Sequence, residues 1–353
     1  MSRKIKGSGK GKKKIAAGIL SLMLVGVGIM GCSFGSETPS ANGDTENGQE
    51  SVEVRISALK GPTAMGLVKL MKDAQEKNIG KESYTCSILA SPEEVTPKIV
   101  QGSLDIASVP ANLASVLYNQ TDGAIQVLMV NTLGVLNIVE NGDTIHSVAD
   151  LKGKTIYASG KGSTPEYALN YILEQNGLVP GNDVIIEWKS EHSECVAAIL
   201  SDPSKIAMLP QPFVTTAMEK NPSFRVALDL TEEWDEVQKD DEEKSAMITG
   251  VTVARRDFVK KNKEAVEGFL RKYQESVDYV NSHVKEAAKL VGEYEIVTED
   301  VAEKALPECS IVYIDGEEME EMLSGYLSVL EEQNPKSIGG ELPRDDFYYK
   351  KEE

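Results

Sequence analysis

Small and polar residues gather in several short segments of this chain, where they could hold a small molecule. Hydroxyl and amide groups supply directed hydrogen bonds, glycines let the backbone approach a solute closely, and lysines supply positive charge. The candidate ligand-binding residues are Lys60, Gly61, Thr63, Ser91, Asn112, Asn131, Lys161, Ser163, Thr164, His192, Gln211 and Phe213. Their chemistry is that of reversible binding to a polar solute.

Several of these positions also have a simple structural interpretation. Gly160 and Gly162 could be ordinary turn residues. Ser163 with Glu166, or Thr164 ahead of a proline, is expected to cap a helix whether or not it also binds a solute. The sequence leaves both interpretations open for this segment.

The aromatic and histidine candidates are ambiguous in the same way. Phe213 could belong to the core or offer a stacking face, and His192 could simply begin a helix at the surface. The other histidines, His146 and His283, are distant in sequence, and the H-x-x-C spacing of His192 and Cys195 has no second pair beside it. We therefore expect no metal site.

No set of residues for catalysis can be identified in the sequence. It contains no nucleophile, base and orienting group in a recognisable arrangement, and no cysteine-rich iron motif. We expect no catalytic residue, no cofactor and no enzyme activity. Cys86, Cys195 and Cys309 are expected to be unpaired thiols, mostly buried.

The charge of the chain excludes one class of partner. The 353 residues carry a net charge of −19, yet residues 1–31 hold seven basic residues and no acidic one. Residues 32–353 therefore carry 30 basic and 56 acidic residues, a net charge of −26. Such an acidic body repels polyphosphate, so we expect no nucleic-acid partner.

Acidic residues also occur beside the candidate binding loops. Glu93, Glu94, Glu166 and Glu191 lie near the expected starts of three helices. A helix N-terminus carries about half a positive charge, so one carboxylate can cancel it. The sequence favours a singly charged anion, a zwitterion or a neutral polar ring over a dianion.

Strand and helix patterns alternate along the body of the chain and would place the candidate residues. Strands are expected at 52–59, 84–90, 104–109 and 125–130, with helices between them. A second set is expected at 155–158, 184–188, 206–209 and 225–230. This alternation predicts parallel sheets with helices on both faces. A further strand at 248–254 precedes a long amphipathic helix with apolar positions from Val266 to Val291.

The order of these elements also predicts where a ligand binds. In open α/β sheets, ligands lie beyond the carboxyl ends of the strands, against the starts of the following helices. The candidate residues stand in the loops at these ends. They therefore predict a site built from two sheets.

The first 50 residues have the pattern of an export signal and a tether. Residues 1–14 are basic, residues 15–31 are apolar and uncharged, and residues 33–50 are mostly small or polar. The segment Ile29-Met30-Gly31-Cys32 resembles the bacterial lipobox, in which the cysteine is lipidated. We expect a signal peptide at 1–31, a flexible tether at 32–50 and lipidation of Cys32; an uncleaved signal anchor is the alternative.

Three segments of the body resemble one family of transport proteins. They are residues 147–177 (SVADLKGKTIYASGKGSTPEYALNYILEQNG), 102–107 (GSLDIA) and 249–257 (TGVTVARRD). With the lipobox and tether, they resemble the solute-binding lipoproteins of bacterial ABC importers. Within these, they resemble the nitrate/sulfonate/taurine type, which includes proteins similar to the pyrimidine-precursor binders of thiamine synthesis.

The resemblance implies a fold and a division of the chain. The family has the type II periplasmic-binding-protein fold, in which two α/β lobes are joined by two crossover strands. Here the crossovers would be 135–141 and 248–254. Lobe 1 would comprise 51–137 plus 250–353, and lobe 2 would comprise 138–249.

The resemblance also implies a function. The protein would be an extracytoplasmic lipoprotein, held on the cell membrane, that captures a small polar solute between its lobes and delivers it to an ABC permease. A sulfonate- or nitrate-like anion and a pyrimidine-type thiamine precursor are the expected solutes, and a monomer is the expected state. The alternative is a ligand-binding sensor or scaffold lipoprotein of the same fold with no transport role.

Overall fold

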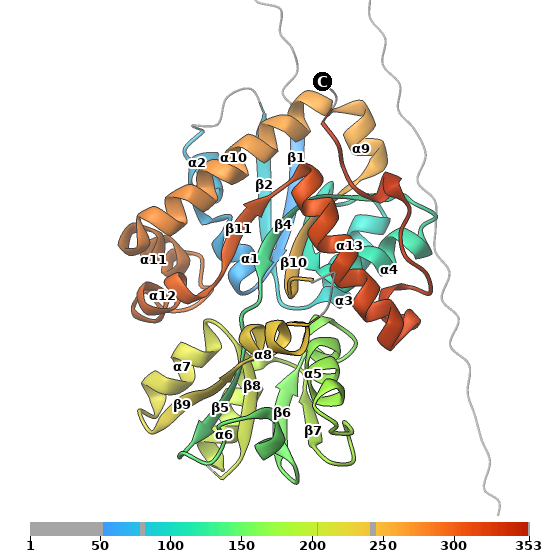
Figure 1. Cartoon of the computed structure of the whole chain (residues 1–353). Helices are drawn as coiled ribbons and strands as arrows, with labels where there is room; N and C mark the ends of the chain where they lie inside the picture. The colour runs from blue at the N-terminus through green and yellow to red at the C-terminus, as the bar shows by residue number, and fades with distance from the viewer. Residues whose placement is uncertain (1–51, 78–81, 203, 241–244, 352–353) are drawn as a thin grey trace, which may run out of the picture. The chain divides into compact units, whose positions relative to one another are not determined.

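A computed structural model describes residues 52–77, 82–202, 204–240 and 245–351 (Figure 1). The predicted signal peptide, the lipobox with Cys32 and the tether lie outside these residues. Residues 50–353 form one compact unit. Within the part of the chain that the structure describes, no helix is both long and apolar enough to cross a membrane.

The first sheet has six strands in the order β11-β4-β10-β3-β1-β2. Its strands are β1 (Glu53–Leu59), β2 (Ser83–Leu89), β3 (Ile106–Pro110), β4 (Ile125–Leu133), β10 (Ile248–Arg255) and β11 (Ile311–Ile314). Strand β1 is parallel to β2 and β3, in the registers Ile56–Cys86 and Ile56–Ile106. We call this sheet and the helices packed on it lobe 1.

The helices of lobe 1 come from both ends of the chain. They are α1 (Pro62–Met65), α2 (Val68–Gln75), α3 (Pro92–Val100), α4 (Ala111–Gln120), α9 (Arg256–Lys261), α10 (Lys263–Ser282), α11 (Val284–Glu293), α12 (Glu299–Ala305) and α13 (Gly316–Gln333). Strands rich in Val, Ile and Ala, buried on both faces, form the centre of this lobe.

The second sheet has five strands in the order β7-β6-β8-β5-β9. Its strands are β5 (Leu136–Asn141), β6 (Thr155–Ser159), β7 (Ile185–Lys189), β8 (Ile206–Pro210) and β9 (Phe224–Asp229). Its helices are α5 (Thr164–Gln175), α6 (His192–Ser201), α7 (Phe213–Lys220) and α8 (Leu230–Val237). We call this sheet and these helices lobe 2. The predicted α/β class with two sheets is confirmed, and the lobe boundaries at 137/138 and 249/250 remain a prediction.

Both sheets are mixed, where the alternating pattern had predicted parallel sheets. Strand β10 runs antiparallel between β3 and β4, and β5 runs antiparallel between β8 and β9. Each inserted strand follows a segment of the other lobe, because β4 continues into β5 and the chain after α8 continues into β10. A strand that arrives from the other lobe enters in the opposite direction to the strands beside it.

The long helix expected across Val266–Val291 is interrupted. Helix α10 ends at Ser282 and α11 begins at Val284, with His283 between them at φ −124° and ψ 57°. This backbone is not helical, and it redirects α11 so that it packs on α12 and α2. The apolar spacing continued across the break because both helices bury a face in the same core.

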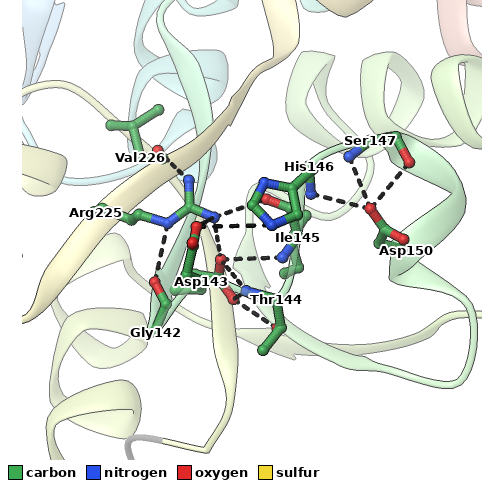
Figure 2. A network of polar contacts seen from close by, with 10 residues as sticks. Gly142, Asp143, Thr144, Ile145, His146, Ser147, Asp150, Arg225 and Val226 are labelled. Carbon is green, nitrogen blue, oxygen red and sulfur yellow. Dashed lines mark hydrogen bonds and ion pairs between the residues drawn. The ribbon is translucent and has the colours of Figure 1, made fainter.

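A polar network closes the end of lobe 2 where β5 finishes (Figure 2). Glu140 is 2% exposed, and its carboxylate accepts hydrogen bonds from the backbone N–H groups of Thr144 and Ile145. The Arg225 guanidinium forms an ion pair with Glu140 at 2.5 Å and donates to the Ile145 carbonyl at 2.8 Å. Because β5 is antiparallel to β8, this network lies at the opposite edge of the sheet from the carboxyl end of β8.

Candidate functional site

The edges of the two lobes that carry the candidate residues contact one another. From the start of α4 in lobe 1, Asn112 Nδ2 donates to the Gly162 carbonyl at 3.4 Å. From the start of α5 in lobe 2, Thr164 Oγ1 donates to Asn112 Oδ1 at 3.5 Å. Both helices follow the carboxyl end of a strand, β3 and β6. The structure thus brings together the loops that the sequence had placed at the two sheet edges.

Four candidate side chains are buried and have hydrogen-bond partners inside the protein. Asn112 is 1% exposed and also donates to the Ser337 carbonyl at 3.0 Å. Thr164 has no exposed surface, and Gln211 accepts from the Thr215 backbone N–H and hydroxyl. These side chains support the loops around the site and hold the two lobe edges together. The fourth, Asn131, belongs to a separate buried cluster.

That cluster surrounds Gly250 on strand β10. Asn131 Nδ2 donates to Thr252 Oγ1 at 2.9 Å, and the Asn131 side chain has no exposed surface. A Cβ atom at Gly250 would lie 2.5 Å from Asn131 Oδ1 and 2.8 Å from Thr63 Cγ2, so only glycine fits there. Gly250 was not among the candidate residues predicted from the sequence, although a glycine inside an apolar strand is a known sign of close packing.

Both lysine candidates are exposed. Lys60 follows β1 in lobe 1, and Lys161 lies in the loop between β6 and α5 in lobe 2. Among the described residues, the amino group of neither lysine has an ion-pair or hydrogen-bond partner. Each lobe therefore carries one such lysine at the carboxyl ends of its parallel strands.

The loop that holds Lys161 is built on two glycines. Gly160 and Gly162 have φ angles of +84° and +76°, the left-handed region that glycine adopts without strain. A Cβ at Gly160 would also lie 2.8 Å from the Pro165 ring, whereas none of the atoms around Gly162 lies within 4 Å of a Cβ position. Both glycines therefore act as turn residues, and the side of Gly162 where a Cβ would stand is open. Gly61 in lobe 1 is itself buried, although no atom of the described residues lies within 4 Å of a Cβ position there either.

The serines at two helix starts do not cap their helices with their side chains. Ser91 and Ser163 occupy the N-cap positions of α3 and α5, but neither side chain accepts a hydrogen bond from its helix. Ser163 Oγ donates to the Gly160 carbonyl at 2.8 Å instead. The expectation that Ser163 caps with its side chain is wrong, because the tight glycine turn offers its hydroxyl a nearer acceptor.

Glutamates occupy these helix starts instead. Glu94 accepts from the Ala90 N–H at 3.3 Å and Glu166 from the Gly162 N–H at 2.6 Å. The third helix start uses Glu194, where Glu191 had been the expected acid; Glu194 accepts from the Ser190 N–H at 3.0 Å. Three backbone donors at the loops after β2, β6 and β7 are thus already bound to carboxylates.

His192 and Phe213 lie side by side in lobe 2. Their ring centroids are 5.1 Å apart, and both side chains are half-buried. Ser159, the last residue of β6, makes a hydrogen bond with His192 Nδ1. Burial lowers the pKa of His192 to about 4, so the imidazole is neutral at pH 7. Phe213 contacts the core of lobe 2 on one side, so it is partly a core residue.

The described residues contain no group of three or more His, Cys, Asp or Glu side chains placed to hold a metal ion. Cys86, Cys195 and Cys309 are free thiols, two of them buried, as expected. Desolvation raises the pKa of Cys195 to about 11 and that of Cys86 to about 12, so both stay protonated at pH 7.

Comparison with known proteins places the chain. A family model described as the periplasmic substrate-binding protein of phosphonate ABC transporters matches residues 73–298. The chain belongs to this family. The predicted resemblance to ABC-importer solute-binding proteins is confirmed, and the family is one of transport proteins that bind a solute, not of enzymes. No curated protein matches the sequence.

Solved structures of ABC solute-binding proteins share the fold. An ABC transporter protein from Parabacteroides distasonis is 23% identical with a TM-score of 0.70, covering 86% of this chain and 100% of that one. The aliphatic sulphonate-binding protein SsuA of Escherichia coli is 18% identical with a TM-score of 0.66, covering 84% and 92%. The nitrate-binding protein NrtA of Synechocystis is 15% identical with a TM-score of 0.56, covering 76% and 75%.

Proposed function

We propose that this substrate-binding protein captures a small polar solute between its two lobes and delivers it to a membrane permease. The observation that supports this most is the contact of Asn112 in lobe 1 with Gly162 and Thr164 in lobe 2. It joins the two sheet edges at which α/β folds bind ligands. A solute held there would touch both lobes and so would stabilise their closed arrangement.

The preferred solute is a singly charged anion such as a sulfonate or nitrate. Lys60 and Lys161 are exposed and uncommitted, one on each lobe, so each can donate to an anionic group. No atom of the described residues lies within 4 Å of a Cβ position at Gly61 or Gly162, so these glycines leave room for a solute beside the lysines.

A dianion such as a phosphonate fits this site less well. Glu94, Glu166 and Glu194 already accept from backbone donors that a dianion would need. Each carboxylate also cancels much of the partial positive charge at the N-terminus of its helix, which would otherwise attract an anion. We therefore propose that this member of the family prefers a single negative charge to two.

A pyrimidine-type ring is the second candidate. It is favoured by the half-buried pair of Phe213 and His192, which offers flat aromatic surface beside a neutral imidazole. A neutral ring would use Lys161 or the Ser91 hydroxyl as a hydrogen-bond donor.

We further propose that the protein is a monomeric lipoprotein on the outer face of the membrane. Its support is the basic and apolar sequence of residues 1–31 and the lipobox around Cys32. Labelling with a radioactive fatty acid should therefore mark the wild-type chain and not Cys32→Ser. Label on the variant would remove Cys32 as the anchor.

Thermal unfolding of the purified chain against a panel of solutes tests the binding proposal. The panel holds methanesulfonate, taurine, nitrate, an aminopyrimidine and methylphosphonate. A ligand at 100 times its dissociation constant adds about 2.7 kcal/mol of stability. This corresponds to a rise in Tm of roughly 5–10 °C for a protein of this size.

The panel separates the candidates. A rise with methanesulfonate, taurine or nitrate supports the anion proposal, and a rise with the aminopyrimidine alone supports the second candidate. A rise with methylphosphonate alone would contradict the preference for a single charge. No rise with any solute would favour the sensor or scaffold interpretation.

A further inference from the structure

The lobes also meet at a second edge, where the contact is an ion pair. Lys304 on α12 of lobe 1 and Glu219 on α7 of lobe 2 are 2.5 Å apart. Their side chains are 65% and 29% exposed. Beside them Thr215, Met218 and Pro222 complete the lining of a hollow of about 640 Å³ between α7 and α12. The pair lies at an edge exposed to solvent, at the left of the view in Figure 1, where α12 approaches α7.

The lobes are joined differently on the side of α5 and α13, on the other side of the view in Figure 1. There Tyr171 of α5 packs on Trp234 of α8, with ring centroids 4.6 Å apart. Trp234 in turn packs on Tyr326 of α13, at 5.4 Å. Trp234 and Tyr326 have no exposed surface. Helix α13 contacts β4 and α4 of lobe 1, so this aromatic row ties the two lobes together.

The free energy needed to separate the lobes differs between these two edges. Parting the aromatic row would expose large apolar rings to water, which is strongly unfavourable. Parting an exposed ion pair returns both charges to water and changes an equilibrium by no more than about fivefold. Any motion that separates the lobes is therefore expected at the α7–α12 edge, with the aromatic row as its pivot.

We propose that Lys304 and Glu219 form a latch that holds the lobes closed at the α7–α12 edge. The pair acts as a positioning pair, because it biases the lobes toward closure without touching the solute. The inference goes beyond the proposed function and does not depend on which solute is bound. If this holds, Lys304 and Glu219 influence how long a solute stays bound, although neither residue lies in the candidate binding loops.

Small-angle X-ray scattering of the purified chain without any solute tests the latch. K304E places two acids face to face, so we expect its radius of gyration to be larger than that of the wild type at low salt. Glu219→Gln removes the pair without repulsion and should shift the radius in the same direction by less. The double variant K304E/E219K restores the pair with its charges exchanged and should return the wild-type curve.

A matched control lies in the same region of lobe 1. Lys285 on α11 pairs with Glu303 on α12 at 3.7 Å, so K285E makes the same change of charge within one lobe. K285E should scatter as the wild type does. The wild type in 1 M NaCl should move toward K304E, because the Debye length falls to about 3 Å.

The latch is overturned if K304E and Glu219→Gln both scatter as the wild type at low salt. It is also overturned if K285E expands the protein as much as K304E, or if the double variant stays expanded. Thermal unfolding of each variant shows that it is folded. Since no solute is present, these results are independent of whether the panel identifies a ligand.

Discussion

At the scale of single residues, Lys161 is the side chain whose role is easiest to isolate. It is exposed, has no partner among the described residues and lies on a glycine turn at the edge where the lobes meet. We expect Lys161→Ala to weaken binding of an anionic panel solute by about 1.5–3 kcal/mol, the contribution of a hydrogen bond to a charged group. Calorimetric titration measures this loss, and the free energy of unfolding should stay unchanged.

Lys152→Ala is the matched control for Lys161. Lys152 is 68% exposed and precedes the amino end of β6, whereas Lys161 follows the carboxyl end of the same strand. Its substitution should leave the affinity unchanged. Equal affinities for Lys161→Ala and the wild type would remove Lys161 from the site.

His192 makes a prediction about pH. Its pKa in the folded protein is about 4 because of burial, against an ordinary value of 6.5. Between pH 6.5 and 4 the unfolded chain therefore binds a proton that the folded chain does not, so stability falls as the pH falls through this range. The slope from this group is at most about 1.4 kcal/mol per pH unit.

Urea unfolding at pH 7 and pH 5 measures this effect. The loss of stability between the two should be smaller in His192→Gln than in the wild type. His146→Gln, a change at an exposed histidine, should lose as much as the wild type does. An undiminished loss in His192→Gln would show that another group titrates in this range.

The residue types of the candidate site were chosen from the sequence, but the exposure of each side chain could not be predicted from it. Hydroxyl, amide and lysine side chains in loops after strands indicated binding, and the structure brings several of them to one place. Asn112 and Asn131 are buried because residues far along the chain, Gly162 and Thr252, supply their partners. Such partners depend on how the lobes pack, which local patterns do not encode.

At the scale of elements, the network between β5 and β9 should be structural (Figure 2). Burial opposes ionisation of Glu140, but hydrogen bonds from Thr144 and Ile145 and the charge of Arg225 outweigh it, so its pKa is lowered. Arg225→Ala would leave that carboxylate buried without its cation. We expect a loss of about 3 kcal/mol in the free energy of unfolding at pH 7.

Chemical denaturation measures this loss, with Arg344→Ala as the control. Arg344 is 67% exposed, pairs with the exposed carboxylate of Asp346 and donates to the Tyr118 hydroxyl at 3.0 Å. The Tyr118 hydroxyl also bonds to Asp346, so removal of Arg344 leaves no buried charge unpaired and should cost about 1 kcal/mol. Solute affinity of Arg225→Ala should match the wild type, since the network lies away from the lobe contact. A loss as small as that of Arg344→Ala would contradict the structural role.

Most element positions were predictable, and the order of strands within each sheet was not. Strand β8 was expected at 206–209 and is found at Ile206–Pro210, because its apolar run and flanking residues are local signals. The antiparallel pairing of β5 with β8 and β9, and of β10 with β3 and β4, was not predicted. Strand pairing joins residues far apart in sequence, which local patterns do not reveal. The break at His283 was missed because the apolar spacing runs through it.

At the scale of the whole molecule, the proposed function requires that one solute contact both lobes at once. The contact of Asn112 with Gly162 and Thr164 brings the edges together, and Lys60 and Lys161 stand one on each side. Sequence alone predicted two α/β lobes through the family resemblance. It could not predict that one lobe contact is aromatic and the other an exposed ion pair.

Hydrogen exchange tests this requirement most directly, with the chain measured alone and with the panel solute that raises its Tm most. We predict that the solute slows exchange at residues 60–64 of lobe 1 and at residues 160–164 of lobe 2 together. The amides of Thr144 and Ile145, in the network away from the lobe contact, should exchange as before. Slower exchange confined to one lobe, or found in that network instead, would contradict a solute bound between the lobes.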